Sequence, residues 1–239
     1  MKLNKKFLLA AAAAALLAGC SSPAARMALK SAGLASTAVY YVQPSSVLDA
    51  PFSPPPAADS EAQARDLAEI LAWQNKRTAA ECEHANVTSE AGYEYYLESD
   101  SPFGQPLPAE AKEFFDRVSA DLAGVVSPMK DRYKRPRPYK AYPDQAQPCI
   151  KKSWGYSYPS GHSAYSRVFA EVMGDIEPAR KAYYVSLADG VALDRVIGGV
   201  HFPTDIAAGK AAAVMFHEAL LKSPAYQADV QKMRGLLKK

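Results

Sequence analysis

Cysteine and long apolar runs are scarce in this chain of 239 residues. Its three cysteines, Cys20, Cys82 and Cys149, never stand in Cys-x-x-Cys spacing, which argues against a structural zinc site or a thioredoxin-like motif. After the N-terminal segment, no apolar run approaches the roughly 20 residues that cross a bilayer as a helix. Strand-like alternation is rare and no internal repeat is visible, so β-rich and solenoid architectures are disfavoured.

An excess of charge is also missing once the N-terminus is set apart. The sequence contains 28 Lys+Arg and 25 Asp+Glu, but Lys2, Lys5 and Lys6 lie within the first 20 residues, where no acidic residue occurs. The remainder has 25 residues of each sign and is close to neutral. Nucleic-acid binding, which depends on a strong positive field, is therefore not expected, and any positive potential must be local.

Residues 1–19 have the layout of a bacterial secretory signal. A basic start precedes an apolar stretch from Phe7 to Leu17, and Leu17-Ala18-Gly19-Cys20 follows. These last four residues resemble a lipobox. We therefore expect Cys20 to carry a lipid that anchors the protein, on the periplasmic side, to a bacterial membrane, in our interpretation the outer one. The alternative is an ordinary signal peptide that happens to end near a cysteine.

The periplasm is an oxidising compartment, which bears on the two remaining cysteines. There Cys82 and Cys149 can form one disulfide that closes a long loop, which is the pairing we expect. The alternative is two separate buried thiols.

The rest of the chain divides into a tether and a helical domain. Residues 20–58 are rich in Ala, Ser and Pro, which predicts a lipid-anchored tether or a segment lying over the surface. Residues 59–239 form the predicted domain, in which helical periodicity, capping residues and first-turn prolines indicate the helices. The expected segments are about 61–85, 108–126, 161–174, 177–196, 203–222 and 224–237.

Residues 127–159, between the second and third of these helices, contain six prolines and predict a long irregular loop. A loop of this length inside a compact domain usually carries function. The expected fold is all-α, a helical bundle with a long irregular Pro-rich loop that carries part of the active site.

Two clusters of chemically active residues lie in or beside this loop. Lys130 with Arg137-Pro138 forms a basic pair, a feature that is by itself typical of a solvated face. Pro159-Ser160-Gly161-His162 directly precedes a predicted helix. Free N–H groups at a helix start suit an anion, and Gly161 lets the backbone approach it closely.

A third cluster consists of Arg195, His201 and Asp205. The spacing of four between His201 and Asp205 lets the carboxylate hydrogen-bond one imidazole nitrogen, which leaves the other nitrogen free as a nucleophile. A lone His–Asp pair is more often a structural contact. Arg195 on the same stretch and a second motif histidine, His162, favour the catalytic interpretation.

Together, Lys130-x6-Arg137-Pro138, Pro159-Ser160-Gly161-His162 and Arg195-x5-His201-x3-Asp205 resemble the three-part signature of the type 2 phosphatidic acid phosphatase superfamily. Its soluble secreted branch, the bacterial class A non-specific acid phosphatases, is the most similar in size and in having a secretory signal. The resemblance implies hydrolysis of small phosphomonoesters through a phosphohistidine, with no metal and no other cofactor.

The resemblance also implies a role for each motif residue. His201 would attack phosphorus, Asp205 would stabilise its charged form, and His162 would protonate the leaving alcohol and then activate water. The phosphoryl oxygens would be bound by Lys130, Arg137, Ser160, the backbone of Gly161, and Arg195. Asp194 departs from the pattern, because the family usually has Ser there. That carboxylate either orients Arg195 or lowers the positive potential of the pocket.

Several alternatives stay open. The same superfamily includes vanadate-dependent haloperoxidases and lipid or polyprenyl phosphate phosphatases, and a lipid-anchored enzyme can reach membrane substrates. A non-catalytic phosphate-binding lipoprotein needs the cations but not the two histidines. A zinc hydrolase would use His162, His201 and Asp205 as ligands. Assembly into a homo-oligomer is also left open by the sequence.

Overall fold

The computed structural model describes residues 38–90, 92–97 and 101–238. The expected signal segment and Cys20 lie outside these residues. Within the described part the regular structure is entirely helical and no strand is present, which confirms the all-α prediction. None of the described helices is both long enough and apolar enough to cross a membrane. The elements are α2 (Ser45–Leu48), α3 (Glu61–Lys76), α4 (Ala79–Val87), the 3-10 turn η1 (Thr88–Glu90), α5 (Tyr93–Leu97), α6 (Ala109–Tyr133), α7 (Pro138–Ala141), α8 (Gly161–Ile176), the 3-10 turn η2 (Pro178–Arg180), α9 (Lys181–Ile197), α10 (Pro203–Leu221) and α11 (Pro224–Gly235).

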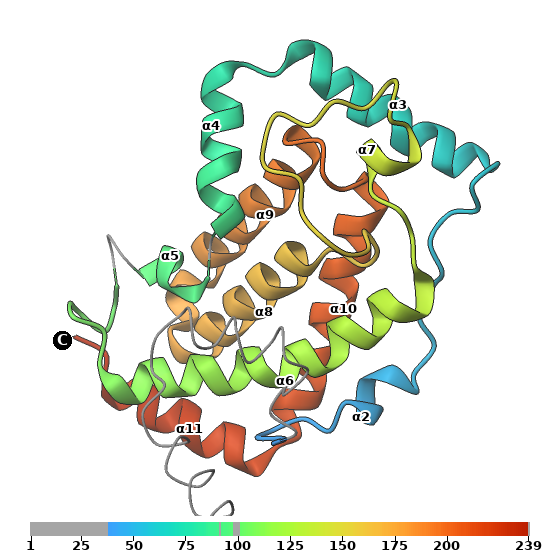
Figure 1. Cartoon of the computed structure of the whole chain (residues 1–239). Helices are drawn as coiled ribbons and strands as arrows, with labels where there is room; N and C mark the ends of the chain where they lie inside the picture. The colour runs from blue at the N-terminus through green and yellow to red at the C-terminus, as the bar shows by residue number, and fades with distance from the viewer. Residues whose placement is uncertain (1–37, 91, 98–100, 239) are drawn as a thin grey trace, which may run out of the picture. The chain divides into compact units, whose positions relative to one another are not determined.

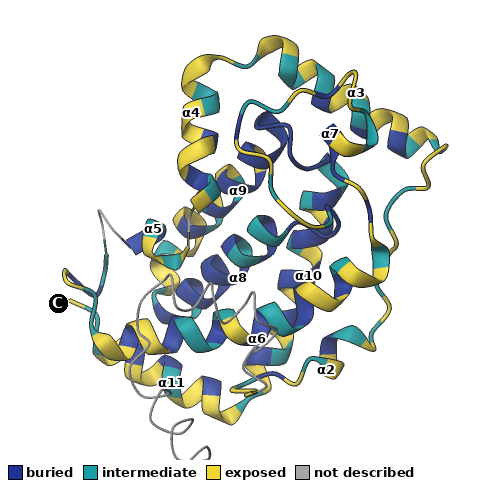
Figure 2. Cartoon of the chain, viewed as in Figure 1, coloured by how far each residue is buried: buried dark blue, intermediate teal, exposed yellow. Residues whose placement is uncertain are grey.

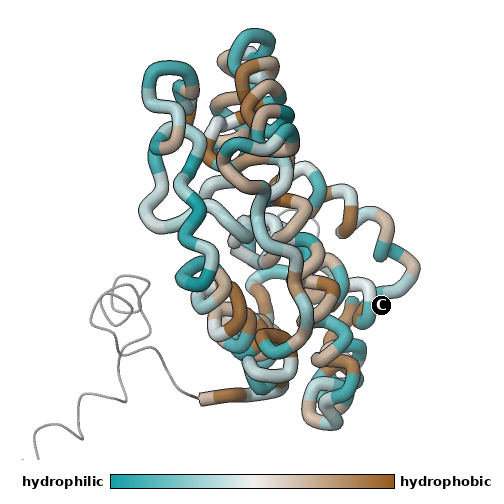
Figure 3. The backbone as a smooth tube through the Cα atoms, turned by 90° about the vertical axis from the view of Figure 1, so that its right-hand side faces the viewer, coloured by the Kyte–Doolittle hydropathy of each residue, from teal (hydrophilic) through white to brown (hydrophobic). Residues whose placement is uncertain are grey.

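Helix α8 is the central element of the bundle (Figure 1), and it packs most extensively against α9 and α10. It is buried along most of its length (Figure 2). Hydrophobic and hydrophilic residues alternate along the surrounding helices (Figure 3), so that each helix can turn an apolar face inward. The main core includes Phe114 and Phe115 of α6, Phe169 of α8 and Phe216 of α10.

The single helix expected over residues 61–85 is wrong, because the structure has two helices there. Helix α3 ends at Lys76, and Arg77 and Thr78 have extended backbones. The Thr78 hydroxyl accepts a hydrogen bond from the Glu81 N–H, while the Glu81 carboxylate accepts one from the Thr78 N–H. This capping box starts a new helix in a different direction. The apolar periodicity of the sequence continues across this change of direction, which is why one helix was expected.

The helix expected to end near residue 126 runs instead to Tyr133 and contains Pro128. A proline inside a helix costs roughly 3 kcal/mol, because it removes an N–H and crowds the carbonyl four residues earlier. Val125, Val126 and Met129 on either side are buried in the core and hold the helix on course, while Pro128 lies on the exposed face. Lys130 therefore belongs to a helix and not to the irregular loop.

The segment before α3, expected to be a tether or a segment lying over the surface, packs on the helices in its described part. From Val39 onward it belongs to the same compact unit as the helices. Val42 and Val47 are buried in the main core. The buried carboxylate of Asp121 on α6 accepts hydrogen bonds from the backbone N–H groups of Tyr40, Tyr41 and Val42. Residues 39–58 are thus fixed on the bundle, which moves the boundary of the compact unit well before residue 58.

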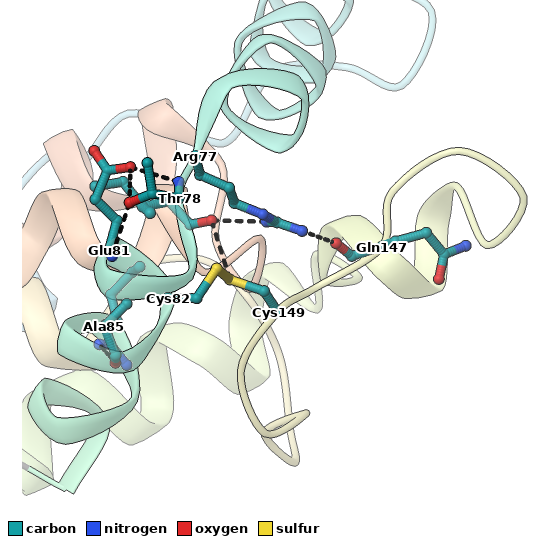
Figure 4. Close-up of a disulfide and its surroundings, with 9 residues drawn as sticks. Arg77, Thr78, Glu81, Cys82, Ala85, Gln147 and Cys149 are labelled. Carbon is teal, nitrogen blue, oxygen red and sulfur yellow. Dashed lines mark hydrogen bonds between the residues drawn. A yellow bond between two sulfur atoms is a disulfide. The ribbon is translucent and has the colours of Figure 1, made fainter.

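The Pro-rich loop is joined to α4 by a disulfide. Figure 4 shows the bond between Cys82 and Cys149. Their Cα atoms lie 5.8 Å apart. Beside them, the Arg77 guanidinium donates hydrogen bonds to the carbonyl of Gln147 in the loop and to that of Ile197 at the end of α9. The loop is therefore held to both helices.

Candidate active site

The turn between α9 and α10 brings His201 back towards the end of α9. Gly199 has φ of +75°, a left-handed conformation that favours glycine. The turn lets the N–H groups of Val200 and His201 both donate to the Arg195 carbonyl. The imidazole that results is almost completely buried, and its Nδ1 lies 3.4 Å from the Asp205 carboxylate in the first turn of α10.

The other ring nitrogen of His201 faces Arg137. Nη1 of Arg137 lies 2.9 Å from Nε2 of His201 and 3.0 Å from the Val200 carbonyl oxygen. A guanidinium only donates hydrogen bonds, so Nε2 must be the acceptor and the ring proton must sit on Nδ1. This tautomer places a proton on Nδ1, which lies 3.3 Å from the Ser157 hydroxyl oxygen and 3.4 Å from Asp205 Oδ2, and points a lone pair at the cation.

Lys130, Ser160 and Gly161 meet at the start of α8. Ser160 caps the helix, because its hydroxyl accepts from the Ser163 N–H. The Lys130 ammonium donates to the carbonyls of Tyr156 and Pro159 at 2.9 and 2.7 Å. A methyl group on Gly161 would meet the Lys130 Cε only at an ordinary contact distance of 3.8 Å. The helix start is thus open to an anion that the ammonium can neutralise.

His162 and Arg195 are held by the last turn of α4 and by η1, which follows it. Nε2 of His162 lies 2.9 Å from the Ser89 carbonyl oxygen. Arg195 is fully buried and donates from Nη2 to the Ala85 carbonyl and to the Thr88 hydroxyl. Its buried Nε has no hydrogen-bond partner among the described residues. A buried donor without a partner is costly, so this atom is a natural contact for an anion.

Asp194, the position at which this chain departs from the family, does not face the anion site directly. Its carboxylate accepts a hydrogen bond from the Thr88 hydroxyl at 2.8 Å and lies 3.1 Å from Nδ1 of His84. Because Thr88 also accepts from Arg195 at 2.6 Å, Asp194 orients the guanidinium through Thr88. Neither Thr88 nor the involvement of His84 was expected from the sequence.

The electrostatics show that these motif groups converge. Burial, followed by the charges of Arg137 and Lys130, lowers the pKa of His201 well below its usual value. Burial and the charge of Arg195 lower the pKa of His162 to about 4. Burial and the charge of Arg137 lower the pKa of Lys130 to about 7, and burial lowers the pKa of Arg195 to about 10. Each shift disfavours a positive charge, because the cationic groups are buried close to one another. A bound anion would offset this repulsion.

Arg135 is a further residue that the sequence did not single out. It is buried and donates to Asp205 Oδ1 and to Asp66 Oδ2, both at 2.6 Å. Arg135 lies in a run of basic residues, and the sequence does not indicate which members of such a run are buried. Its role could therefore not be predicted. The described residues contain no group of three or more His, Cys, Asp or Glu side chains that could hold a metal ion.

Comparison with protein families agrees with this arrangement. Residues 118–228, which include all three motifs, match the model of the PAP2 superfamily. The chain contains a PAP2 superfamily domain. The matched segment thus contains the motif residues that the structure brings together at the site.

Curated relatives of the chain are named non-specific acid phosphatases. Those of Salmonella typhi, Salmonella typhimurium and Providencia stuartii are 35%, 30% and 27% identical to it, over 33%, 44% and 63% of its length. The matches span only 31%, 43% and 59% of those relatives. The name of these relatives is that of the enzyme class that the three motifs resemble.

Two solved structures share the fold. A bacterial vanadium-dependent iodoperoxidase matches 72% of this chain and 52% of its own, with a TM-score of 0.56 and 18% identity. A transmembrane PAP2-type phosphatidylglycerolphosphate phosphatase from Bacillus subtilis matches 68% of this chain and 86% of its own, with a TM-score of 0.50 and 21% identity. At these identities the similarity concerns the fold alone.

Proposed function

We propose that this protein is an acid phosphatase that hydrolyses phosphomonoesters through a phosphohistidine on His201 and needs no metal. The observation that carries the proposal is the position of His201 between the Asp205 carboxylate and the Arg137 guanidinium. The Nδ1–H of the imidazole faces the Asp205 carboxylate and the lone pair of its Nε2 points towards Arg137, beside Lys130 and Arg195. A lone pair among three cations is suited to attack an anionic phosphoryl group that those cations bind.

In the first step Nε2 of His201 forms a bond to phosphorus while the bond to the ester oxygen breaks. The positive charge that develops on the imidazole is stabilised by Asp205. Lys130, Arg137 and Arg195 neutralise the charge spread over the equatorial phosphoryl oxygens. His162, in its protonated form, donates a proton to the leaving alcohol.

In the second step water replaces His201 on phosphorus. Neutral His162 accepts a proton from the water, the P–N bond breaks, and inorganic phosphate leaves with His201 restored. The low pKa of His162, about 4, means that the free site holds it mostly neutral. A bound phosphate dianion favours its protonated form, so we expect acidic conditions to favour the first step.

The relatives named non-specific acid phosphatases support phosphomonoesters as the substrate class. We propose in addition that residues 1–19 direct secretion and that Cys20 carries the lipid anchor. Mass spectrometry of membrane-extracted protein tests this, because a diacylglyceryl group should be found on Cys20 and be absent from Cys20→Ala. An unmodified chain that starts at another residue would contradict the anchor.

The activity is tested with His201→Ala and His162→Ala on two substrates in excess EDTA. His201→Ala should lose several orders of magnitude of turnover with both substrates, because no phosphoenzyme can form. His162→Ala should be severely impaired with an alkyl phosphate and much less with nitrophenyl phosphate, whose leaving group needs no proton. Quenching with alkaline detergent, in which the P–N bond of a phosphohistidine survives, should trap labelled phosphate on His201 and accumulate it in the His162 variant.

Three outcomes would favour the alternatives. Loss of activity in EDTA that zinc restores would indicate a metal hydrolase. Oxidation of a halide by peroxide after loading with vanadate, without phosphatase activity, would indicate a haloperoxidase. Tight phosphate binding with no turnover and no trapped phosphohistidine would indicate a binding protein. Vanadate should instead inhibit the proposed phosphatase, since it mimics pentacoordinate phosphorus.

A further inference from the structure

The two oxygens of the Asp205 carboxylate have different partners. Oδ1 accepts a hydrogen bond from Nη1 of Arg135 at 2.6 Å. Oδ2 accepts from the Phe202 N–H at 2.8 Å and from the Ser157 hydroxyl, and it is the oxygen that faces Nδ1 of His201. Arg135 thus fixes one oxygen and leaves the other directed at the histidine.

Arg135 is itself fixed from the opposite side by helix α3. Its Nη2 donates to Asp66 Oδ2 and to Gln63 Oε1, both at 2.6 Å. The guanidinium also lies over the Phe202 ring, with its carbon 4.2 Å from the ring centroid. A planar fork with donors on both sides bridges two carboxylates in a fixed geometry, which the flexible ammonium of a lysine does not impose.

Asp66 ties the same network to the start of α10. Its Oδ1 accepts from the Thr204 N–H at 3.1 Å, and its Oδ2 accepts from the Thr204 hydroxyl. Thr204 is the residue immediately before Asp205. The helix start that carries the carboxylate is therefore held by α3 through both its backbone and its side chain.

The charges of this network match the needs of His201. Asp66, Arg135 and Asp205 are all nearly inaccessible to solvent, and together they carry one net negative charge. A buried carboxylate stays ionised only when it is well paired. Arg135 pairs with Asp205, and because it is shared with Asp66 its single positive charge does not balance both carboxylates.

The other groups facing His201 come from several elements. They are Lys130 of α6, Arg137 before α7, Ser157 of the loop, His162 of α8 and Arg195 of α9. The charged members of this set are cations that oppose a positive imidazole. Asp205 is the carboxylate that compensates for them, so its placement matters.

We infer that Arg135 and Asp66 are positioning residues that hold Asp205 so that it stabilises, together with Arg137 at Nε2, the Nδ1–H tautomer of His201. The inference deepens the proposed function and rests on His201 being the nucleophile there. It assigns a role in the reaction to two residues outside the three motifs. These residues, Asp66 and Arg135, are 69 positions apart along the chain.

The test combines kinetics with ¹⁵N NMR of histidine-labelled protein in Arg135→Lys and Asp66→Asn. The wild type should show a protonated Nδ1 and an unprotonated Nε2 on His201. Both variants should show a mixture of tautomers. Their kcat should fall by about 10- to 100-fold with KM within about twofold, because a small misplacement of the nucleophile affects the chemical step more than binding.

The matched control is Arg117→Lys. Arg117 also links a carboxylate and a hydroxyl, Asp229 at 3.0 Å and Tyr41 at 2.7 Å, but it joins α6 to α11 and to the N-terminal segment. It should leave both the tautomer and kcat unchanged. If Arg135→Lys does not fold, the nearly isosteric Asp66→Asn carries the test, with circular dichroism checking each variant.

Folded variants that keep the pure Nδ1–H tautomer and the wild-type kcat would overturn the inference, as would equal effects in Arg117→Lys. The proposed function fails in a different way. If the wild type hydrolyses no phosphomonoester, the proposed reaction is wrong, yet a tautomer change confined to the Arg135 and Asp66 variants would still establish the positioning.

Discussion

At the scale of single residues, the site depends on hydrogen bonds that residues outside the motifs make to the motif side chains. Thr88 is the clearest case. Its buried hydroxyl accepts from Arg195 and donates to Asp194, so it holds the guanidinium by one donor and leaves Nε free. The carboxylate at position 194, where the family usually has Ser, therefore acts through Thr88 and does not enter the anion site.

Thr88→Val tests this arrangement, because valine keeps the shape and removes the hydroxyl. A hydrogen bond to a charged group contributes about 1.5–3 kcal/mol, so kcat/KM should fall by roughly 10- to 100-fold. Arg195 contacts the phosphoryl group in both the bound substrate and the transition state, so much of the loss should appear in KM. Thr88→Ser, which restores the hydroxyl, should recover most of the activity. An unchanged KM in Thr88→Val would contradict the role.

Lys130 predicts a pH dependence. Its pKa of about 7, set by burial and by Arg137, means that the ammonium is present below pH 7 and is lost as the pH rises through that value. Substrate binding requires the charged form, so kcat/KM should fall above pH 7 by roughly tenfold for each further unit. In Lys130→Arg the same fall should move to much higher pH, because a guanidinium stays charged. A fall near pH 7 that persists in the variant would assign it to another group.

The pH profile of kcat provides an internal control. Once phosphate is bound, its negative charge favours the charged form of Lys130 and raises the pKa of the ammonium. The alkaline limb of kcat should therefore lie at higher pH than that of kcat/KM. Coincident limbs would show that Lys130 does not contact the anion.

At the scale of elements, the position of the site depends on how closely α10 approaches the start of α8. Gly209 lies at that contact. A Cβ there would come within 2.5 Å of the Ser160 carbonyl oxygen and 2.8 Å of the Ser163 Cβ. Ser160 is the cap of α8, and its N–H donates to the Asp205 carbonyl oxygen. The absence of a side chain at 209 lets the two helix starts that carry the site meet.

Gly209→Ala should destabilise the protein by about 1–3 kcal/mol, because backbone atoms must move apart. It should also lower kcat, since Ser160 and Asp205 move with their helices. Gly190→Ala is the matched control, because Gly190 lies in α9 with open space around it. That change should stabilise the protein by about 0.4–1 kcal/mol and leave kcat unchanged. Urea unfolding measures both effects, and equal stability of the two variants would contradict the close approach.

The elements also show what the sequence can and cannot predict. His201 and Asp205 are four residues apart, so their contact is local and could be predicted. The capping box at Thr78 was equally local but was masked by apolar periodicity that continues across it. The helix through Pro128 could not be predicted, because core contacts on both sides outweigh the local cost. The contact of Arg135 with Asp66 depends on tertiary packing, and nothing in either segment indicates it.

At the scale of the whole molecule, two walls of the site come from parts of the chain that are far apart in sequence. The segment of α4 and η1 provides the carbonyls of Ala85 and Ser89 and the Thr88 hydroxyl, which hold Arg195 and His162. The Pro-rich loop provides the carbonyls that hold Lys130 and Arg137. The Cys82–Cys149 disulfide joins these two walls, since one cysteine lies in each.

Removing this disulfide should therefore lower both stability and substrate affinity. The bond joins residues 67 positions apart, for which the loop-entropy model gives about 4 kcal/mol of stabilisation. Cys82→Ser/Cys149→Ser should accordingly lower the melting temperature by about 10 °C. KM for nitrophenyl phosphate should rise as the segment holding Arg195 and His162 loosens. Dithiothreitol should reproduce both effects in the wild type and change nothing in the double variant. A reduced wild type that keeps its melting temperature and KM would show that packing alone, through contacts such as that of Arg77 with the loop, holds the two walls together.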